Sequence, residues 1–143
     1  MRRRLAALHY DQMPAPSGQR STPSINPYLV CVAAWVVPGG GHLWLGKYQK
    51  GLTLLVVLPL MFAFGLWIQG RIFPFQFSDL LVGLAALADL GIGLPYFLAR
   101  LVGAGAGNVI AITYEYGNTY VIVAGLLNML AVLDAFDIAA GRK

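Results

Sequence analysis

The feature that most constrains this chain is a series of four apolar runs, at about residues 28–46, 51–69, 79–101 and 119–139, that carry few charged side chains. A helix rises 1.5 Å per residue, so a run of about 20 residues can cross the roughly 30 Å hydrocarbon core of a bilayer. In lipid, a chain satisfies its backbone hydrogen bonds only as helices or closed barrels. The runs therefore predict an all-α, polytopic membrane protein with about four transmembrane helices, arranged as two hairpins.

Composition agrees with a membrane location. The 143-residue chain is 58% hydrophobic and 11% charged, whereas soluble domains carry about 25% charged residues. A chain of this length forms one domain, and the four runs leave little sequence for a catalytic module outside the membrane. Residues 1–27, which contain four arginines and four prolines, are expected to form an irregular basic tail. The membrane domain then covers residues 28–143.

The positions of the ten basic residues indicate membrane topology and not nucleic-acid binding. They flank the apolar runs and do not gather into one basic surface. With four spans, seven basic residues lie on the side of the termini and three, Lys47, Lys50 and Arg100, lie on the other. Loops rich in lysine and arginine stay in the cytoplasm, so both termini are predicted to be cytoplasmic. The single cysteine, Cys31, excludes an internal disulfide framework.

Residues 109–123 allow two interpretations. Their alternation of apolar and polar side chains around Gly117 and Asn118 fits a β-hairpin as well as the approach to the last span. An open hairpin in lipid would leave backbone groups unsatisfied along its edges. We therefore favour the helix, and the hairpin stays as the alternative.

The most distinctive stretch joins the first two runs and interrupts the first of them at a proline. It reads Pro-Gly-Gly-Gly-His-Leu-Trp-Leu-Gly-Lys over residues 38–47, then continues through a basic turn into the second run. This pattern resembles the two-transmembrane-helix domain family, and the positions that carry the resemblance are Pro38, Gly39, Gly41, Gly46, Lys47, Lys50 and Gly51.

The resemblance covers residues 28–69, about a third of the chain. It implies a helical hairpin in a bacterial inner membrane and no agreed enzymatic activity. Residues 114–143 also resemble the C-terminal part of small bacterial membrane proteins of unknown function that carry the same hairpin. This chain has a second pair of apolar runs that the two-span family lacks. The role of two-span family members therefore cannot be transferred to this chain.

Glycines in two places match parts of nucleotide-binding motifs. Gly41, Gly46 and Lys47 fit part of the phosphate-binding loop, but Tyr48 stands where a magnesium-binding hydroxyl is needed and no strand precedes them. The glycine-rich stretch 102–108 does not fit the dinucleotide-binding spacing. Because no nucleophile, base and orienting group can be assembled from these residues, an enzyme is the least supported class.

His42, near the end of the first run, is the candidate for cofactor binding. A neutral imidazole nitrogen can be the axial ligand of a haem or another tetrapyrrole. A hydrogen bond at the helix end explains the same histidine without a cofactor. The sequence thus leaves lipid and tetrapyrrole as candidate bound groups, and it predicts no metal site.

Asp89 is anomalous because it lies near the middle of the third run. A charged carboxylate at the bilayer centre costs about 2.5–3.5 kcal/mol on insertion scales, so Asp89 has to be neutral, paired or hydrated. Asn128 lies at a similar depth in the last run, and we expect a hydrogen bond between the two side chains. A proton or ion site and a contact with another subunit are the alternatives.

Asp134 and Asp137 are three residues apart and share one face of the last predicted helix. Carboxylates are unfavourable near a helix C-terminus, so these two require cationic partners. The basic residues predicted for the same side are the N-terminal arginines, Arg71, Arg142 and Lys143. We expect an acidic face that packs against the tail or against a partner protein.

These observations favour a small, non-catalytic integral membrane protein that serves as an accessory or structural subunit. Its helices would pack against a larger membrane complex, with an energy-transducing complex, respiratory or photosynthetic, as the candidate host. One alternative is a small transporter or proton-conducting bundle that uses Asp89, and another is a pigment- or haem-binding protein that uses His42. The expected partners are membrane lipid and larger protein subunits, not nucleic acid.

Overall fold

The computed structural model describes residues 25–76 and 78–142, and all regular structure within these ranges is helical. The helices are α2 (Pro27–Val36), α3 (Gly40–Trp44), α4 (Tyr48–Trp67), α5 (Leu80–Leu90), α6 (Leu94–Leu101) and α7 (Tyr114–Ala139). An isolated bridge between Arg71 and Ala106 pairs two extended segments. The prediction of an all-α fold is confirmed, and most of the predicted tail lies outside the described residues.

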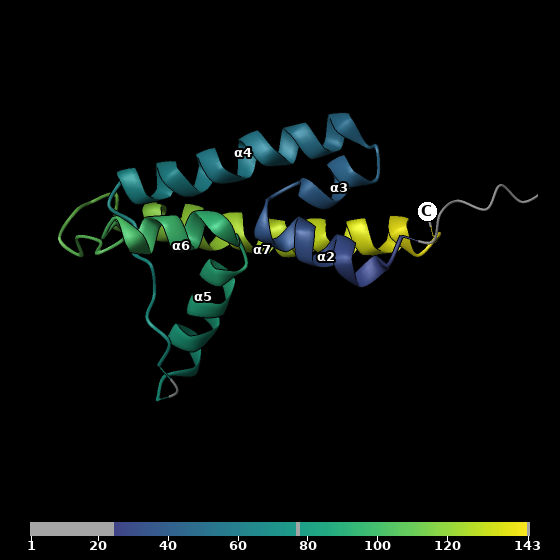
Figure 1. Ribbon diagram of the computed structural model, residues 1–143. Helices are drawn as coiled ribbons and strands as arrows, with labels where there is room; N and C mark the ends of the chain where they lie inside the picture. Colours follow the sequence, from purple (N-terminus) through teal and green to yellow (C-terminus); the bar gives the residue numbers. More distant parts are fainter. Residues whose placement is uncertain (1–24, 77, 143) are drawn as a thin grey trace, which may run out of the picture.

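Helices α4 and α7 form the framework of the molecule. They have 20 and 26 residues, and both are long and apolar enough to cross a membrane. They lie side by side and run in opposite directions, while α2 packs against α7 and the short α3 contacts both α2 and α4 (Figure 1). The predicted spans 51–69 and 119–139 therefore correspond to continuous helices.

The first predicted span, 28–46, is wrong as a single helix. Helix α2 ends at Val36, and α3 returns toward the end of the molecule at which α2 began (Figure 1). Pro38 lies at this turn, where it cannot continue the hydrogen bonding of α2. Gly39 has a φ of 80°, and a Cβ at this position would overlap the carbonyl oxygen of Gly51 in α4. The chain can therefore double back only because residue 39 has no side chain.

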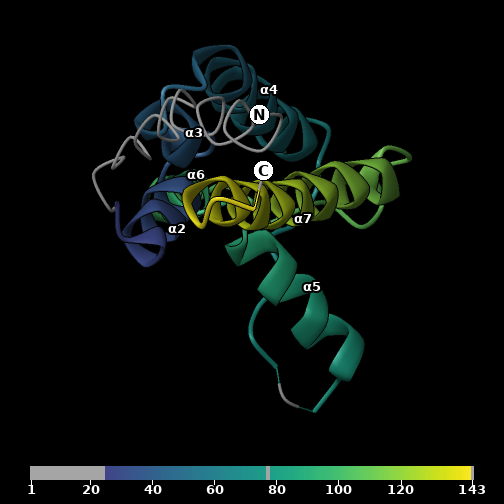
Figure 2. The same cartoon turned by 90° about the vertical axis from the view of Figure 1, so that its right-hand side faces the viewer.

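The third predicted span, 79–101, consists of two helices. Helices α5 and α6 are bent by 104° at a short break, so the pair is a broken span or a re-entrant loop. Helix α6 lies along the bundle, whereas α5 projects away from it (Figures 1 and 2). Two described helices can thus cross a membrane, or three if the bent pair counts as one span, and the predicted four spans are not confirmed.

The alternative β-hairpin over residues 109–123 is wrong. Residues 109–113 form turns and α7 begins at Tyr114, so both Gly117 and Asn118 are helical. Asn118 is buried, and its Oδ1 accepts a hydrogen bond of 2.8 Å from the backbone N–H of Arg71. Glycine and asparagine often form turns, but Gly117 and Asn118 are helical here because they pack against Gly70 and Arg71, which follow α4.

The main apolar core lies between α4, α6 and α7, and its buried members are Leu58, Phe62, Ile72, Ile92, Tyr96, Ala99, Val121 and Ala124. A smaller cluster of Val30, Ala34 and Ala135 joins α2 to α7. Large apolar side chains also cover the outside of the bundle, among them Leu60 and Leu130. Such an extended apolar surface is expected of a protein that is surrounded by lipid.

Candidate functional site

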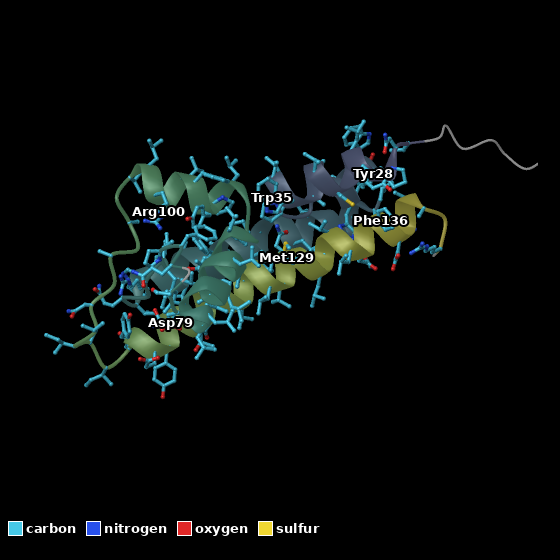
Figure 3. The ribbon with its side chains drawn as sticks, turned by 90° about the horizontal axis from the view of Figure 1, so that it is seen from below. Tyr28, Trp35, Asp79, Arg100, Met129 and Phe136 are labelled. Carbon is cyan, nitrogen blue, oxygen red and sulfur yellow. The ribbon has the colours of Figure 1, made fainter. Side chains whose placement is uncertain are left out.

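The two helix breaks meet against the middle of α7. The indole Nε1 of Trp35, near the end of α2, donates a hydrogen bond of 3.2 Å to the carbonyl oxygen of Leu90 at the end of α5. The Asn128 side-chain amide donates to the carbonyl oxygens of Trp35, at 3.3 Å, and Gly91, at 2.9 Å. Trp35 lies beside Met129, the neighbour of Asn128 on α7 (Figure 3). We refer to Trp35, Leu90, Gly91 and Asn128 as the junction.

The junction supplies hydrogen-bond donors to backbone carbonyl groups that have no partner within their own helix because the helix ends there. The last carbonyls of a helix have no partner within that helix, and Asn128, fully buried, provides both of its amide hydrogens to two of them. The backbones also approach closely here, since a Cβ at Gly93 would overlap the carbonyl oxygen of Trp35. Asn128 is therefore a structural centre that joins α2, α5 and α7.

The predicted hydrogen bond between Asp89 and Asn128 is wrong. Asp89 is fully buried, and its Oδ2 accepts a hydrogen bond of 2.8 Å from the backbone N–H of Phe73. Its Oδ1 and the Oδ1 of Asn128 both lack a hydrogen-bond partner among the residues that the structure describes. The Asp89 carboxylate therefore holds the extended segment between α4 and α5 against α5.

A pair of substitutions at Asp89 tests this structural role. Asp89→Asn is expected to be tolerated, because the amide oxygen can accept the same hydrogen bond from Phe73. Asp89→Leu removes the acceptor, and we expect the Phe73 amide to exchange about tenfold faster in that variant, since a donor that loses its hydrogen-bond partner costs about 1–3 kcal/mol. Hydrogen-exchange mass spectrometry in detergent measures the difference. Equal exchange of the segment 71–76 in both variants would contradict the assignment.

A second polar cluster lies where α3, α4 and α7 meet. The Nε2 of His42 lies 3.0 Å from Oδ2 of Asp134, and Lys50 Nζ donates to the same oxygen at 3.3 Å. The side chain of His42 is 1% exposed, whereas that of Lys50 is 62% exposed. We refer to His42, Lys50 and Asp134 as the His42 cluster. It connects the buried interior of the bundle to one of its ends.

His42 offers no open nitrogen to a tetrapyrrole in this arrangement. Its Nε2 is occupied by Asp134, and its Nδ1 is buried and has no hydrogen-bond partner among the described residues. Nor do three or more histidine, cysteine, aspartate or glutamate side chains gather around a possible metal position anywhere in the described ranges. The geometry therefore gives no support to pigment or haem ligation by His42.

The partners of the two C-terminal aspartates differ from each other. Asp137 pairs with Arg142 at 3.5 Å, one of the expected cations. Asp134 contacts Lys50, which the four-span topology placed on the opposite side of the membrane, and the expected N-terminal arginines lie outside the described residues. The return of α3 explains this contact, because it brings the start of α4 to the end of α7 (Figure 1). Arg71 follows α4 at the other end, so the prediction that it shares a side with these aspartates is wrong.

The motif that joins the first two runs forms a turn, a short helix and a second turn. Pro38 and Gly39 lie at the first turn, Gly41 is buried in α3, and Gly46 has a φ of 73° at the second turn. The remaining members are the N-cap residue Lys47 and, within the first turn of α4, Lys50 and Gly51. The motif therefore positions His42 and the start of α4 against α7.

A groove of about 590 Å³ extends from the His42 cluster along α4 and α7. Gln49 and Thr53 line it beside the cluster, and its remaining walls are apolar, formed by Leu54, Val57, Leu58, Leu127, Leu130 and Ala131. One end of the groove is therefore polar and the rest apolar.

Sequence reasoning missed the contacts of two polar side chains, Trp35 at the junction and Asn118 beside the chain that follows α4. Trp35 reads as one more apolar side chain, although an indole N–H in a membrane needs an acceptor. Asn118 reads as half of a Gly-Asn turn, although a buried asparagine in an apolar helix also signals an interhelical contact. Trp35 could have been flagged as a polar group within an apolar run and Asn118 as one directly before such a run, but neither partner could have been named.

The protein comparisons identify a family and give no function. The chain belongs to a family of unknown function (DUF6677), whose model matches residues 29–143 and thus includes all helices from α2 to α7 except the first two residues of α2. No curated protein and no solved structure matches the chain. The family match does not confirm the resemblance to the two-transmembrane-helix domain. Any functional conclusion therefore depends on the geometry described above.

Proposed function

We propose that this chain is a small, non-catalytic integral membrane protein that acts as an accessory or structural subunit of a larger membrane complex. The observation that carries the proposal is α5, an apolar helix that projects from the bundle (Figure 2). Its outward surface consists of four leucines that are at least half exposed, Leu80, Leu81, Leu84 and Leu87.

Helix α5 is suited to contact a neighbouring protein. It has 11 residues, too few to cross a membrane alone, and its buried residues Ala86, Ala88 and Asp89 all lie in its second half, where it meets α7. The first half extends beyond the bundle and presents large apolar side chains. Exposed apolar surface alone also fits contact with lipid, but α5 projects from the bundle and is too short to span a membrane, so an apolar groove on another membrane subunit is the surface that would enclose it.

The charge distribution supports an orientation for this subunit. The end that contains the start of α4 and the end of α7 carries Lys47, Lys50 and Arg142, whereas Arg71 and Arg100 lie at the other end. By the positive-inside rule the first end faces the cytoplasm. In the proposed setting, a bacterial inner membrane, both termini are then cytoplasmic, and the candidate host is an energy-transducing complex, respiratory or photosynthetic.

The transport alternative has less support from the geometry. Asp89 and Asn128 are both fully buried and bound to backbone groups. These contacts support a structural role for the two polar side chains. A subunit role needs no polar path across the bundle.

The test is co-purification that depends on α5. The tagged chain is isolated from its native membrane in mild detergent, and we expect Leu80→Ser with Leu81→Ser to reduce the amount of a stoichiometric larger subunit about tenfold. Both side chains are 76% exposed, so the expected loss comes from the interface and not from unfolding, and interface anchors typically contribute 2 kcal/mol or more. Quantitative mass spectrometry measures the ratio of subunit to tagged chain.

The matched control is Ile110→Ser with Ile112→Ser, at 88% and 93% exposed positions in the loop before α7. It removes a similar apolar area from a different surface and should leave the ratio unchanged. A wild-type chain that purifies alone, or equal loss in both double variants, would contradict the proposal.

A further inference from the structure

We propose that the groove between α4 and α7 binds one anionic phospholipid, with an acyl chain along its apolar walls and the phosphate group at Lys47 and Lys50. The inference concerns a surface remote from α5 and does not depend on the proposed subunit role. It combines four features of this end of the molecule: the groove, an adjoining basic hollow, the start of α4, and the His42 cluster.

The groove continues into a second hollow with a different lining. This hollow, of about 430 Å³, is formed by residues 46–50 at the start of α4, and it shares Gln49 and Lys50 with the groove. The hollow adds Lys47 to the site, and both lysines are exposed. The two spaces together therefore have an apolar part and a basic part, which is the chemical division of a phospholipid.

The start of α4 favours an anion at the basic end. The first N–H groups of a helix have no partner within it, and the helix dipole places partial positive charge there. Lys47 is the N-cap residue of this 20-residue helix and makes no side-chain capping hydrogen bond. A phosphate in the hollow would therefore meet open backbone donors as well as two ammonium groups.

The His42 cluster sets the charge and polarity at the join between the two spaces. Asp134 Oδ2, 3.3 Å from Lys50 Nζ, offsets one of the two lysines and leaves an excess of positive charge. His42 lines the groove at this point, and its Nε2 lies 3.0 Å from Asp134 Oδ2, so the buried ring fixes that carboxylate beside the lysines. The polar end of the groove is therefore formed by charged and polar groups that are held in place.

The apolar walls decide in favour of a lipid and against free phosphate. Leu54 and Val57 on one side and Leu127 and Leu130 on the other extend away from the lysines along the helices. Inorganic phosphate would use the lysines and leave these walls without a ligand. A phospholipid covers both, and basic residues at a membrane interface each attract anionic lipid by about 1 kcal/mol.

Native mass spectrometry of the full chain in detergent, titrated with phosphatidylglycerol or phosphatidylcholine of the same acyl chains, tests the proposal. We expect phosphatidylglycerol to bind about tenfold more tightly, and Lys47→Gln with Lys50→Gln to lose about tenfold of that affinity. Arg71→Gln with Arg142→Gln is the control, because it removes two positive charges from residues that line neither the groove nor the hollow. We expect this control to stay within about twofold of the wild type.

Two further measurements distinguish the possible ligands. Glycerol phosphate, which lacks acyl chains, should bind at least about tenfold more weakly than phosphatidylglycerol, and Val57→Phe, at a half-exposed wall position, should weaken lipid binding by filling the groove. Circular dichroism confirms that each variant is folded. Equal binding of the two lipids, undiminished binding by the lysine variant or by Val57→Phe, or tight binding of glycerol phosphate would each overturn the proposal.

Discussion

Asn128→Asp is expected to lower the free energy of unfolding by about 2–4 kcal/mol, because it removes the two N–H donors that satisfy the carbonyl groups of Trp35 and Gly91. The substitution leaves the side-chain volume almost unchanged and creates no cavity. It places a carboxyl oxygen against two carbonyl oxygens at a fully buried position. Unfolding in detergent micelles, followed by circular dichroism as a function of sodium dodecyl sulfate, measures the loss.

Asn108→Asp is the matched control for this substitution. Asn108 lies in the loop before α7, and its Oδ1 accepts a hydrogen bond of 3.1 Å from the backbone N–H of Ile110. A carboxylate can accept the same bond, so stability should change by no more than about 0.5 kcal/mol. If both variants unfold at the same detergent concentration, the junction does not stabilise the fold through Asn128.

Gly93→Ala is expected to have a comparably large effect, of about 3 kcal/mol or more. Gly93 precedes α6 with a φ of 77° and a ψ of −128°, a conformation that costs other residues about 1–3 kcal/mol. In addition, the new Cβ would overlap the carbonyl oxygen of Trp35, and displacing a packed backbone adds about 1–3 kcal/mol. The same unfolding measurement reports the sum of both costs.

Gly103→Ala is the control for a positive φ without a close contact. Gly103 has a φ of 70°, but a Cβ there would meet no atom within 4 Å. Its substitution should therefore cost only the backbone strain, about 1–2 kcal/mol. A Gly93→Ala protein that is no less stable than Gly103→Ala would show that the close approach of α2 to α6 is not required.

The long helices could be predicted because length and apolar composition are local properties. Helices α4 and α7 are each continuous over most of a predicted span. Helix α7 begins five residues earlier than predicted, since Gly117 and Asn118 pack against the chain after α4. Local turn propensity was overridden there by a tertiary contact.

The helix breaks could be predicted only in part. Pro38 marks an interruption in the first run, but the sequence does not say whether the chain continues across the membrane or returns. The break between α5 and α6 was missed, because Gly91 and Gly93 are common residue types in membrane helices. What distinguishes them is the carbonyl of Trp35 next to Gly93, which is a long-range contact.

The polar residues of the sites were found, and their partners were not. Asp89, Asn128 and Asp134 stand out from apolar sequence, and all three make polar contacts in the structure. Asp89 and Asn128 bind backbone groups and not other side chains. Reasoning about which side chains pair with each other does not predict such contacts. Asp134 meets Lys50 because of the changed topology, so this error followed from the error in the first span.

The junction also determines when the fold can be completed during synthesis. Asn128 donates a hydrogen bond to the carbonyl oxygen of Trp35 in α2, and it follows Trp35 by 93 residues. Most of the chain has therefore been synthesised before this donor is available to α2. Of the described helices before α7, only α4 is long and apolar enough to enter the bilayer as a span by itself. The half-length helices α2, α5 and α6 therefore reach their final positions only after the C-terminal helix has been inserted.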